Sequence, residues 1–237
     1  GGFFEAIIED REEWVRYQLE YTDYTGNLMV GNDLYAIKKG HVDVPTLVRI
    51  DSTGKEHRIS TFSYNAGRLQ EADGRLYWSE SIEDERWSLQ THSKVRFMET
   101  GSKKKHTLKN DKLLYNPAPS GDRAAVTVYQ IGGKSGIDII DINTGDCIQS
   151  FEAPDSLQIT ETAWIGNDIY AAAVSDNGYG IYRLKTMGRG LWEAVLSPQP
   201  VMVKDFTSHE GELIFACDRT GVHELYHLSP SDGTLRQ

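Results

Sequence analysis

The chain has 237 residues, enough to bury one large core or two small ones, and 39% of its residues are hydrophobic. A net charge of −10 repels phosphate backbones and argues against a nucleic-acid partner. No apolar run approaches the roughly 20 residues of a membrane span, and no basic segment followed by an apolar one predicts a signal peptide. Two cysteines, Cys147 and Cys217, do not make a disulfide framework, and we expect two buried, inert thiols.

The N-terminal segment, residues 1–22, has helical periodicity. Its apolar side chains recur three or four positions apart, with acids and arginines between them: Phe4, Ile7, Ile8, Trp14, Val15 and Leu19. We expect an amphipathic helix from about Phe4 to Leu19. Its apolar stripe must pack on the domain that follows or on a domain further upstream.

After this segment the sequence repeats. One series of glycines, each followed by an apolar run, recurs every 43 to 47 residues: Gly31, Gly74, Gly121, Gly166 and Gly211. A second series recurs every 43 to 47 residues in hairpin-like turns: Gly54, Gly101, Gly145, Gly188 and Gly233. Three or four short apolar runs fall within each period, which is typical of the four-stranded blades of a β-propeller.

The sequence therefore predicts an all-β protein, with a propeller over residues 23–237 behind the N-terminal helix. The expected blades are residues 23–66, 67–111, 112–155, 156–200 and 201–237. Aromatic and β-branched residues are expected where the faces of neighbouring blades meet: Tyr35, Tyr77, Trp78, Ile169, Tyr170 and Phe215. About five blades are visible, and no spare strand links the last blade to the first. We expect a fragment of a ring of six to eight blades, with an arc completed by a partner chain as the alternative.

Parts of a known blade motif, W-S-P-D-G-x-x-I-x-F, are present in several of these repeats. The residues that keep it are Trp164, Gly166 and Ile169; Pro119, Ser120, Gly121 and Asp122; and Ser208, Gly211 and Ile214. The last repeat, "CDRTGVHELYHLSPSDGTLRQ", is similar to S-D-R-x-G-x-x-x-I/L-Y followed by a turn. On these residues the chain resembles the TolB-like propellers, bacterial relatives of WD repeats. No blade carries the full motif, and the Gly-His and Trp-Asp marks of WD repeats are absent.

The arrangement also resembles propellers of large envelope proteins of the Bacteroides group, which often follow a metallopeptidase-like domain in a longer chain. This resemblance implies a bacterial periplasmic or cell-surface location and neighbouring domains in the parent chain. No peptidase domain is visible here.

The string His223-Glu224-Leu225-Tyr226-His227 matches H-E-x-x-H, the zinc signature of metalloproteases. That site needs a helix, on which residues i and i+4 share a face. Turn signals at Gly221 and Pro230 leave room only for a short strand, on which the two histidines would lie about 13 Å apart. Glu224 would point to the opposite face of that strand. We therefore reject His223, Glu224 and His227 as metal ligands.

Three other segments are weaker candidates. Trp87, at the end of "SIEDERW", could contact a partner or belong to the core. The glycine-rich "IGGKSG" joins two strands and opens no helix, which indicates a hairpin rather than a phosphate-binding loop. Lysines of "KKKH" (103–106) head an outer strand and are expected to protect an edge against aggregation, with an anionic-ligand site as the alternative.

We expect a non-catalytic binding or scaffold module, with no catalytic residues and no cofactor or metal, that binds a protein or peptide. A zinc metallohydrolase using the HELYH string is one alternative. A propeller that gates a neighbouring peptidase domain is the other. Fold analogy alone is a weak guide between them.

Overall fold

The computed structural model describes residues 22–40, 44–63, 65–83, 91–130, 132–154 and 156–237. Over these residues the protein is all-β: twenty strands form five four-stranded antiparallel sheets, and no helix is present. The described residues contain no helix long and apolar enough to span a membrane. The predicted N-terminal helix from Phe4 to Leu19 lies outside the described residues.

Each sheet is one blade, with strands in sequence order from one edge to the other. The strand bounds are, in blade 1, Thr22–Val30 (β1), Asp33–Gly40 (β2), Thr46–Ile50 (β3) and Glu56–Thr61 (β4); in blade 2, Gln70–Ala72 (β5), Arg75–Glu83 (β6), Thr91–Glu99 (β7) and His106–Thr107 (β8); in blade 3, Tyr115–Ser120 (β9), Arg123–Tyr129 (β10), Ser135–Asp141 (β11) and Cys147–Glu152 (β12); in blade 4, Gln158–Ile165 (β13), Asp168–Ser175 (β14), Gly178–Lys185 (β15) and Leu191–Gln199 (β16); in blade 5, Val203–His209 (β17), Glu212–Cys217 (β18), Glu224–Leu228 (β19) and Leu235–Arg236 (β20).

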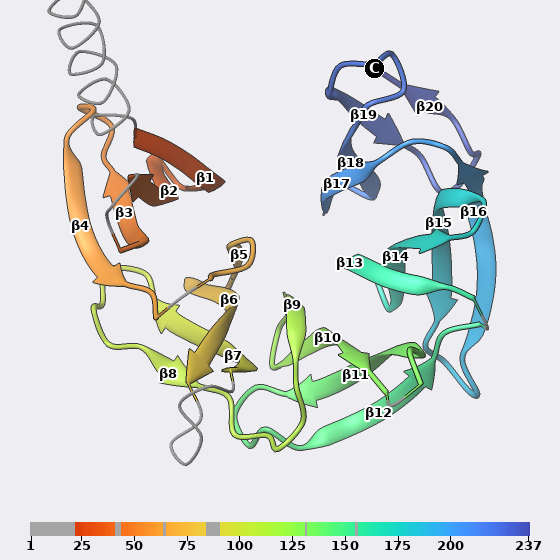
Figure 1. The fold of residues 1–237 in the computed structure, drawn as a ribbon, viewed down its shortest axis with the longest axis horizontal. Coiled ribbons are helices and arrows are strands. Elements are labelled where there is room, and N and C mark those ends of the chain that lie inside the picture. The colour runs from red at the N-terminus through yellow and green to blue at the C-terminus, as the bar shows by residue number, and fades with distance from the viewer. Residues whose placement is uncertain (1–21, 41–43, 64, 84–90, 131, 155) are drawn as a thin grey trace, which may run out of the picture.

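The blades follow one another around a central axis, as in a β-propeller (Figure 1). The first strand of each blade (β1, β5, β9, β13 and β17) faces the centre, and the last strands lie at the outside. The arc is open between blade 1 and blade 5. The five-bladed arrangement predicted from the glycine repeats is confirmed.

The core consists of apolar layers between successive blades rather than one central cluster. Four clusters lie between blades 1 and 2, 2 and 3, 3 and 4, and 4 and 5. All six residues predicted at blade faces are buried, each at most 5% exposed: Tyr35, Tyr77, Trp78, Ile169, Tyr170 and Phe215. Burying each such side chain stabilises the fold by about 1.5–3 kcal/mol, so the stacking of blades supplies most of the driving force.

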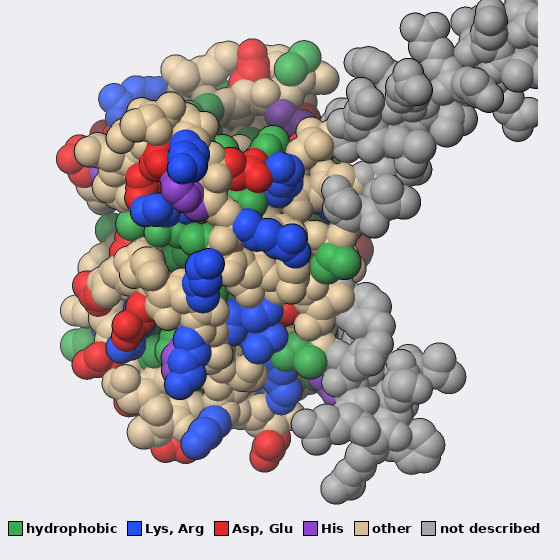
Figure 2. Space-filling model, turned by 90° about the vertical axis from the view of Figure 1, so that its left-hand side faces the viewer, with side chains coloured by type: hydrophobic (Ala, Val, Ile, Leu, Met, Phe, Trp, Pro, Cys, Tyr) green, Lys and Arg blue, Asp and Glu red, His purple; other side chains and the backbone are tan. Residues whose placement is uncertain are grey.

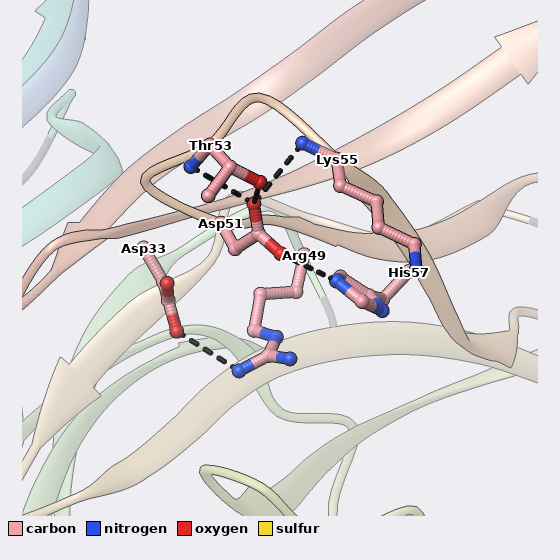
Figure 3. A network of polar contacts seen from close by, with 6 residues as sticks. All are labelled: Asp33, Arg49, Asp51, Thr53, Lys55 and His57. Carbon is pink, nitrogen blue, oxygen red and sulfur yellow. Dashed lines mark hydrogen bonds and ion pairs between the residues drawn. The ribbon is translucent and has the colours of Figure 1, made fainter.

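Aspartates fix the outer hairpins of the blades. In blade 1, Asp51 Oδ1 accepts hydrogen bonds from the backbone amides of Thr53 (3.0 Å) and Lys55 (3.1 Å) and from the Thr53 hydroxyl (2.5 Å), while Oδ2 lies 2.7 Å from His57 Nε2 (Figure 3). The Thr53 hydroxyl and then His57 hold the pKa of Asp51 well below its usual value. The same kind of turn recurs at Asp141, whose carboxylate accepts from two backbone amides within three residues.

Strand pairing beside this hairpin is reinforced by an ion pair between neighbouring strands. Arg49 of β3 lies 3.0 Å from Asp33 of β2 (Figure 3). Both side chains are about one third exposed, so the pair contributes little to stability by itself.

The Asp51 network predicts a pH-dependent stability difference. A carboxyl group whose pKa is lowered by folding stabilises the protein above its unfolded pKa, near 4, and loses this effect as the pH falls toward the folded pKa. We expect Asp51→Asn to lower the melting temperature most at pH 6 and progressively less from about pH 4 downward. Thermal unfolding of both proteins across this range measures the difference. Asp23→Asn, at an exposed position of the same blade, is the control; a difference for Asp51→Asn that does not change with pH would refute the role of this network.

Candidate functional site

The two faces of the arc differ in their connections. Because strands alternate in direction, the links between second and third strands and the linkers between blades all emerge on one face, which we call the loop face. The opposite turn face carries two-residue turns such as Gly31-Asn32 and the outer hairpins. Longer connections are where binding residues most often lie.

Among the described residues, five exposed apolar side chains lie on the loop face. Val222 is 68% exposed in the β18–β19 connection, and Val44 is 56% exposed in the β2–β3 connection. Leu113 and Met202 lie in linkers between blades, and Tyr129 ends β10 at the same face. The turn face also has exposed apolar residues: Met187, Ile148 and Leu191 lie in or beside outer hairpins, and Met29 lies on the inner strand β1 beside its turn.

A cavity of about 500 Å³ opens on the loop face between blades 3 and 4. Its wall consists of residues 132–135, 153–154, 156–158 and 174–176. The hydroxyl of Ser135, which is buried, donates to Leu157 O (2.8 Å) and accepts from Ile159 N (3.0 Å). This side chain thus holds the linker that shapes the cavity. The "IGGKSG" segment joins β10 to β11, two strands, as predicted.

A ring of five residues, four of them polar, lines the centre of the arc. One residue of each inner segment occupies the same place, five positions before the first residue of the following turn: Gly26, Arg68, Asn116, Glu161 and Asp205. We call these five residues the channel ring. Four of the five inner segments show a register shift beside this position, which is the mark of a β-bulge.

Arg68 spans the channel from blade 2 to blades 4 and 5. Its Nη1 atom donates to Phe206 O (2.7 Å) and lies 3.3 Å from Glu161 Oε2. Glu161 also accepts from the backbone amides of Phe206 (2.6 Å) and Asp205 (3.2 Å). Residues 93 and 138 positions apart in the chain are therefore joined at the centre.

The channel ring was not identified from the sequence, although a signal for it exists. Its members share one phase of the repeat, but their residue types differ, so no motif stands out. Aligning the five repeats on their first turns places all five in one column. At the centre of the arc they offer a guanidinium, an amide and two carboxylates, which can donate and accept hydrogen bonds to a ligand entering from the loop face.

The HELYH string lies in a strand. Glu224–Leu228 form β19, the third strand of blade 5, as the turn signals predict, and His223 immediately precedes it. Glu224 accepts a hydrogen bond from the Thr220 hydroxyl (2.7 Å), while His227 Nδ1 lies 3.4 Å from Glu212 Oε2. The described residues contain no group of three or more His, Cys, Asp or Glu placed to hold a metal. The helix that the zinc-hydrolase alternative requires is not formed at residues 224–228.

The structure tests the prediction that both cysteines are buried, but not the prediction for Trp87. Cys217 is buried, as predicted, but the prediction is wrong for Cys147, which is exposed at the start of the outer strand β12. Partial burial and then the nearby carboxylate of Asp138 raise the pKa of the Cys147 thiol. Because the thiolate is the nucleophile, this environment makes Cys147 less reactive. Trp87 lies outside the described residues.

The Arg68 brace predicts a measurable loss of stability. We expect Arg68→Met, which keeps the apolar stem but removes the guanidinium, to lower the free energy of unfolding by about 1–2 kcal/mol, since a charged hydrogen bond and a partly exposed ion pair are lost. Urea denaturation measures this. Arg219→Met, at an exposed arginine of blade 5, should change stability by less than about 0.5 kcal/mol. Equal effects of the two substitutions would show that the cross-channel contact does not stabilise the arc.

Neither a family model nor a curated protein matches this chain. Solved structures do. The chain resembles a structure of a nidogen/laminin complex (TM-score 0.64, 12% identity, covering 88% of this chain and 75% of that one). It resembles a puromycin-hydrolyzing peptidase of Mycobacterium tuberculosis (TM-score 0.64, 10% identity, covering 91% of this chain and 36% of that one). It also resembles an acylaminoacyl peptidase of Pyrococcus horikoshii (TM-score 0.61, 12% identity, covering 93% of this chain and 46% of that one). The chain spans less than half of either peptidase chain. At these identities the likeness shows the fold: a β-propeller like those of nidogen and of the peptidases.

Proposed function

We propose that this chain is a non-catalytic β-propeller module that binds a protein or peptide on its loop face. The observation that carries the proposal is the set of exposed apolar side chains on that face. Val44, Tyr129 and Val222 belong to blades 1, 3 and 5, so they are spread over the width of the arc. Long connections often carry binding residues, and apolar anchors set among polar residues are what a docked protein segment contacts.

The cavity and the channel ring would give such a partner specificity. The cavity of about 500 Å³ between blades 3 and 4 can take one or two side chains of a docked segment. Arg68, Glu161 and Asp205 can fix polar groups that reach the centre. Apolar anchors with a few directed polar contacts are what peptide recognition needs.

We further propose that the chain is TolB-like and forms part of a larger bacterial envelope protein, at the periplasm or cell surface, with neighbouring domains as additional partners. In this proposal other blades complete the ring to six to eight. Two observations support it. The arc is open between blades 1 and 5 (Figure 1). On blade 5, Leu225 of β19 is exposed on the face turned away from the cluster shared with blade 4.

Selection from a random peptide display library against the whole chain tests the binding function. We expect enriched peptides whose dissociation constant rises at least about tenfold for Val44→Asp and for Val222→Asp, because each places a charge in the apolar contact. Met187→Asp changes an equally exposed apolar residue on the turn face and should leave binding within about twofold. Loop-face recognition would be refuted if no peptide were enriched, or if only Met187→Asp abolished the binding of the enriched peptides.

A second candidate function is control of access to a peptidase domain. The likeness to two peptidases whose chains are more than twice as long as the matched region favours it. If a longer protein joins this propeller to a peptidase domain, deleting residues 22–237 should raise cleavage of large substrates relative to short peptides. An unchanged ratio between the two substrate sizes would exclude gating.

A further inference from the structure

Positive charge is concentrated in one short stretch of this acidic chain. Residues 94–112, "KVRFMETGSKKKHTLKNDK", hold seven of the 25 Lys and Arg residues but only two of the 35 Asp and Glu residues. This stretch comprises the second half of β7, the outer hairpin of blade 2, the two-residue strand β8 and the linker toward blade 3. It is net positive, whereas the remainder of the chain is strongly negative.

The structure places this charge on the outer surface of the arc. Figure 2 looks at the side of the molecule formed by blades 1 and 2, and a run of Lys and Arg side chains descends from the middle of that view to its lower edge. Lys103, Lys104, Lys109 and Lys112 are exposed. We call this surface the basic edge. It lies at the periphery of the arc, and it shares the β8–β9 linker, which holds Lys109 and Lys112, with the exposed Leu113 of the loop face.

Some of these cations are already neutralised within the fold. Glu80, which is buried, lies 3.4 Å from Arg96 Nη1 and 4.0 Å from Lys105 Nζ. Lys112 pairs with the buried Asp138 at 2.5 Å. Three of the seven cationic side chains, Arg96, Lys105 and Lys112, are therefore paired with carboxylates inside the fold.

The others are available to a partner. Within the described residues, the side chains of Lys103, Lys104 and Lys109 make no hydrogen bond or ion pair, and Lys94 donates only to the carbonyl oxygen of Asn110 (2.6 Å). An open hollow of about 740 Å³ lies beside two of them, Lys94 and Lys109. It is also lined by Lys112, by Asp111 and Asp146, and by the start of β12 in blade 3. Two uncompensated ammonium groups, those of Lys94 and Lys109, therefore border this hollow, while Lys103 and Lys104 lie in the outer hairpin of blade 2.

We infer that the basic edge binds an acidic, extended polypeptide segment. Lysine ammonium groups are flexible point charges, suited to several carboxylates in a row; a single phosphate is usually held by backbone amides or by the planar fork of arginine. A long nucleic acid would extend over the acidic remainder of the surface and be repelled there. The location also favours an extended chain, because β8 is an outer strand and the lysines on either side of it in the sequence repel a basic strand but attract an acidic one.

Binding of a fluorescent peptide of alternating Glu and Ser, followed by anisotropy at low and physiological salt, tests this inference. We expect the whole chain to bind the peptide, more weakly as salt rises. The combined variant Lys103→Gln, Lys104→Gln, Lys109→Gln should weaken binding at least about tenfold, since three exposed ion pairs are lost. These side chains are exposed, so circular dichroism should show an unchanged fold.

The matched control removes the same charge elsewhere. The control variant combines Arg189→Gln, Lys204→Gln and Arg219→Gln, at residues of blades 4 and 5. It should change the dissociation constant of the peptide by less than about twofold. An equal loss in both variants would mean that only net charge matters and would overturn the inference, as would the absence of peptide binding. A single-stranded oligonucleotide and phosphatidylserine vesicles are the competing probes. Binding of either one as tightly as the peptide, through the same lysines, would also overturn it.

Discussion

The stacking of one blade on the next is the interaction on which the rest of this structure depends. A four-stranded sheet has two faces, and a blade that leaves both in water cannot be stable alone. In this chain the core consists of apolar layers between blades, such as the cluster that joins Leu47 of blade 1 to Trp78 and Met98 of blade 2. Stability is therefore shared along the arc, and each inner blade depends on both of its neighbours.

Stacking brings neighbouring blades together but does not by itself fix the curvature of the arc. The Arg68 contacts add a constraint of a different kind, because they connect blade 2 with blades 4 and 5 directly and skip blade 3. A second contact at the centre, from the Asn116 amide to Thr160 O (2.5 Å), joins blades 3 and 4. The apolar layers thus set the spacing between neighbouring blades, and the polar contacts at the centre set the angle between them.

The features that repeat along the chain could be predicted from the sequence, and those that depend on closure of the arc could not. Two glycine series revealed five four-stranded units, since each glycine marks a turn that must recur once per blade. The strand at Glu224–Leu228 followed from the turn signals on either side of it. The contact between Arg68 and Glu161 joins residues 93 positions apart and exists only because the blades curve toward each other. Cys147 was misplaced because an outer strand has only one neighbour, so residue type alone does not decide its burial.

The bends in the inner strands also decide which side chains can occupy the centre. Gly26, Asn116 and Asp205 take a positive φ there (62°, 46° and 55°), a conformation that glycine, asparagine and aspartate adopt most readily. Backbone geometry alone therefore limits three of the five places to small or short polar residues. Arg68 and Glu161 are free of that restriction, and they are the two that carry long side chains and meet across the axis. The backbone angle in each inner segment thus limits which side chain the centre can hold there, and with it which pair can meet across the axis.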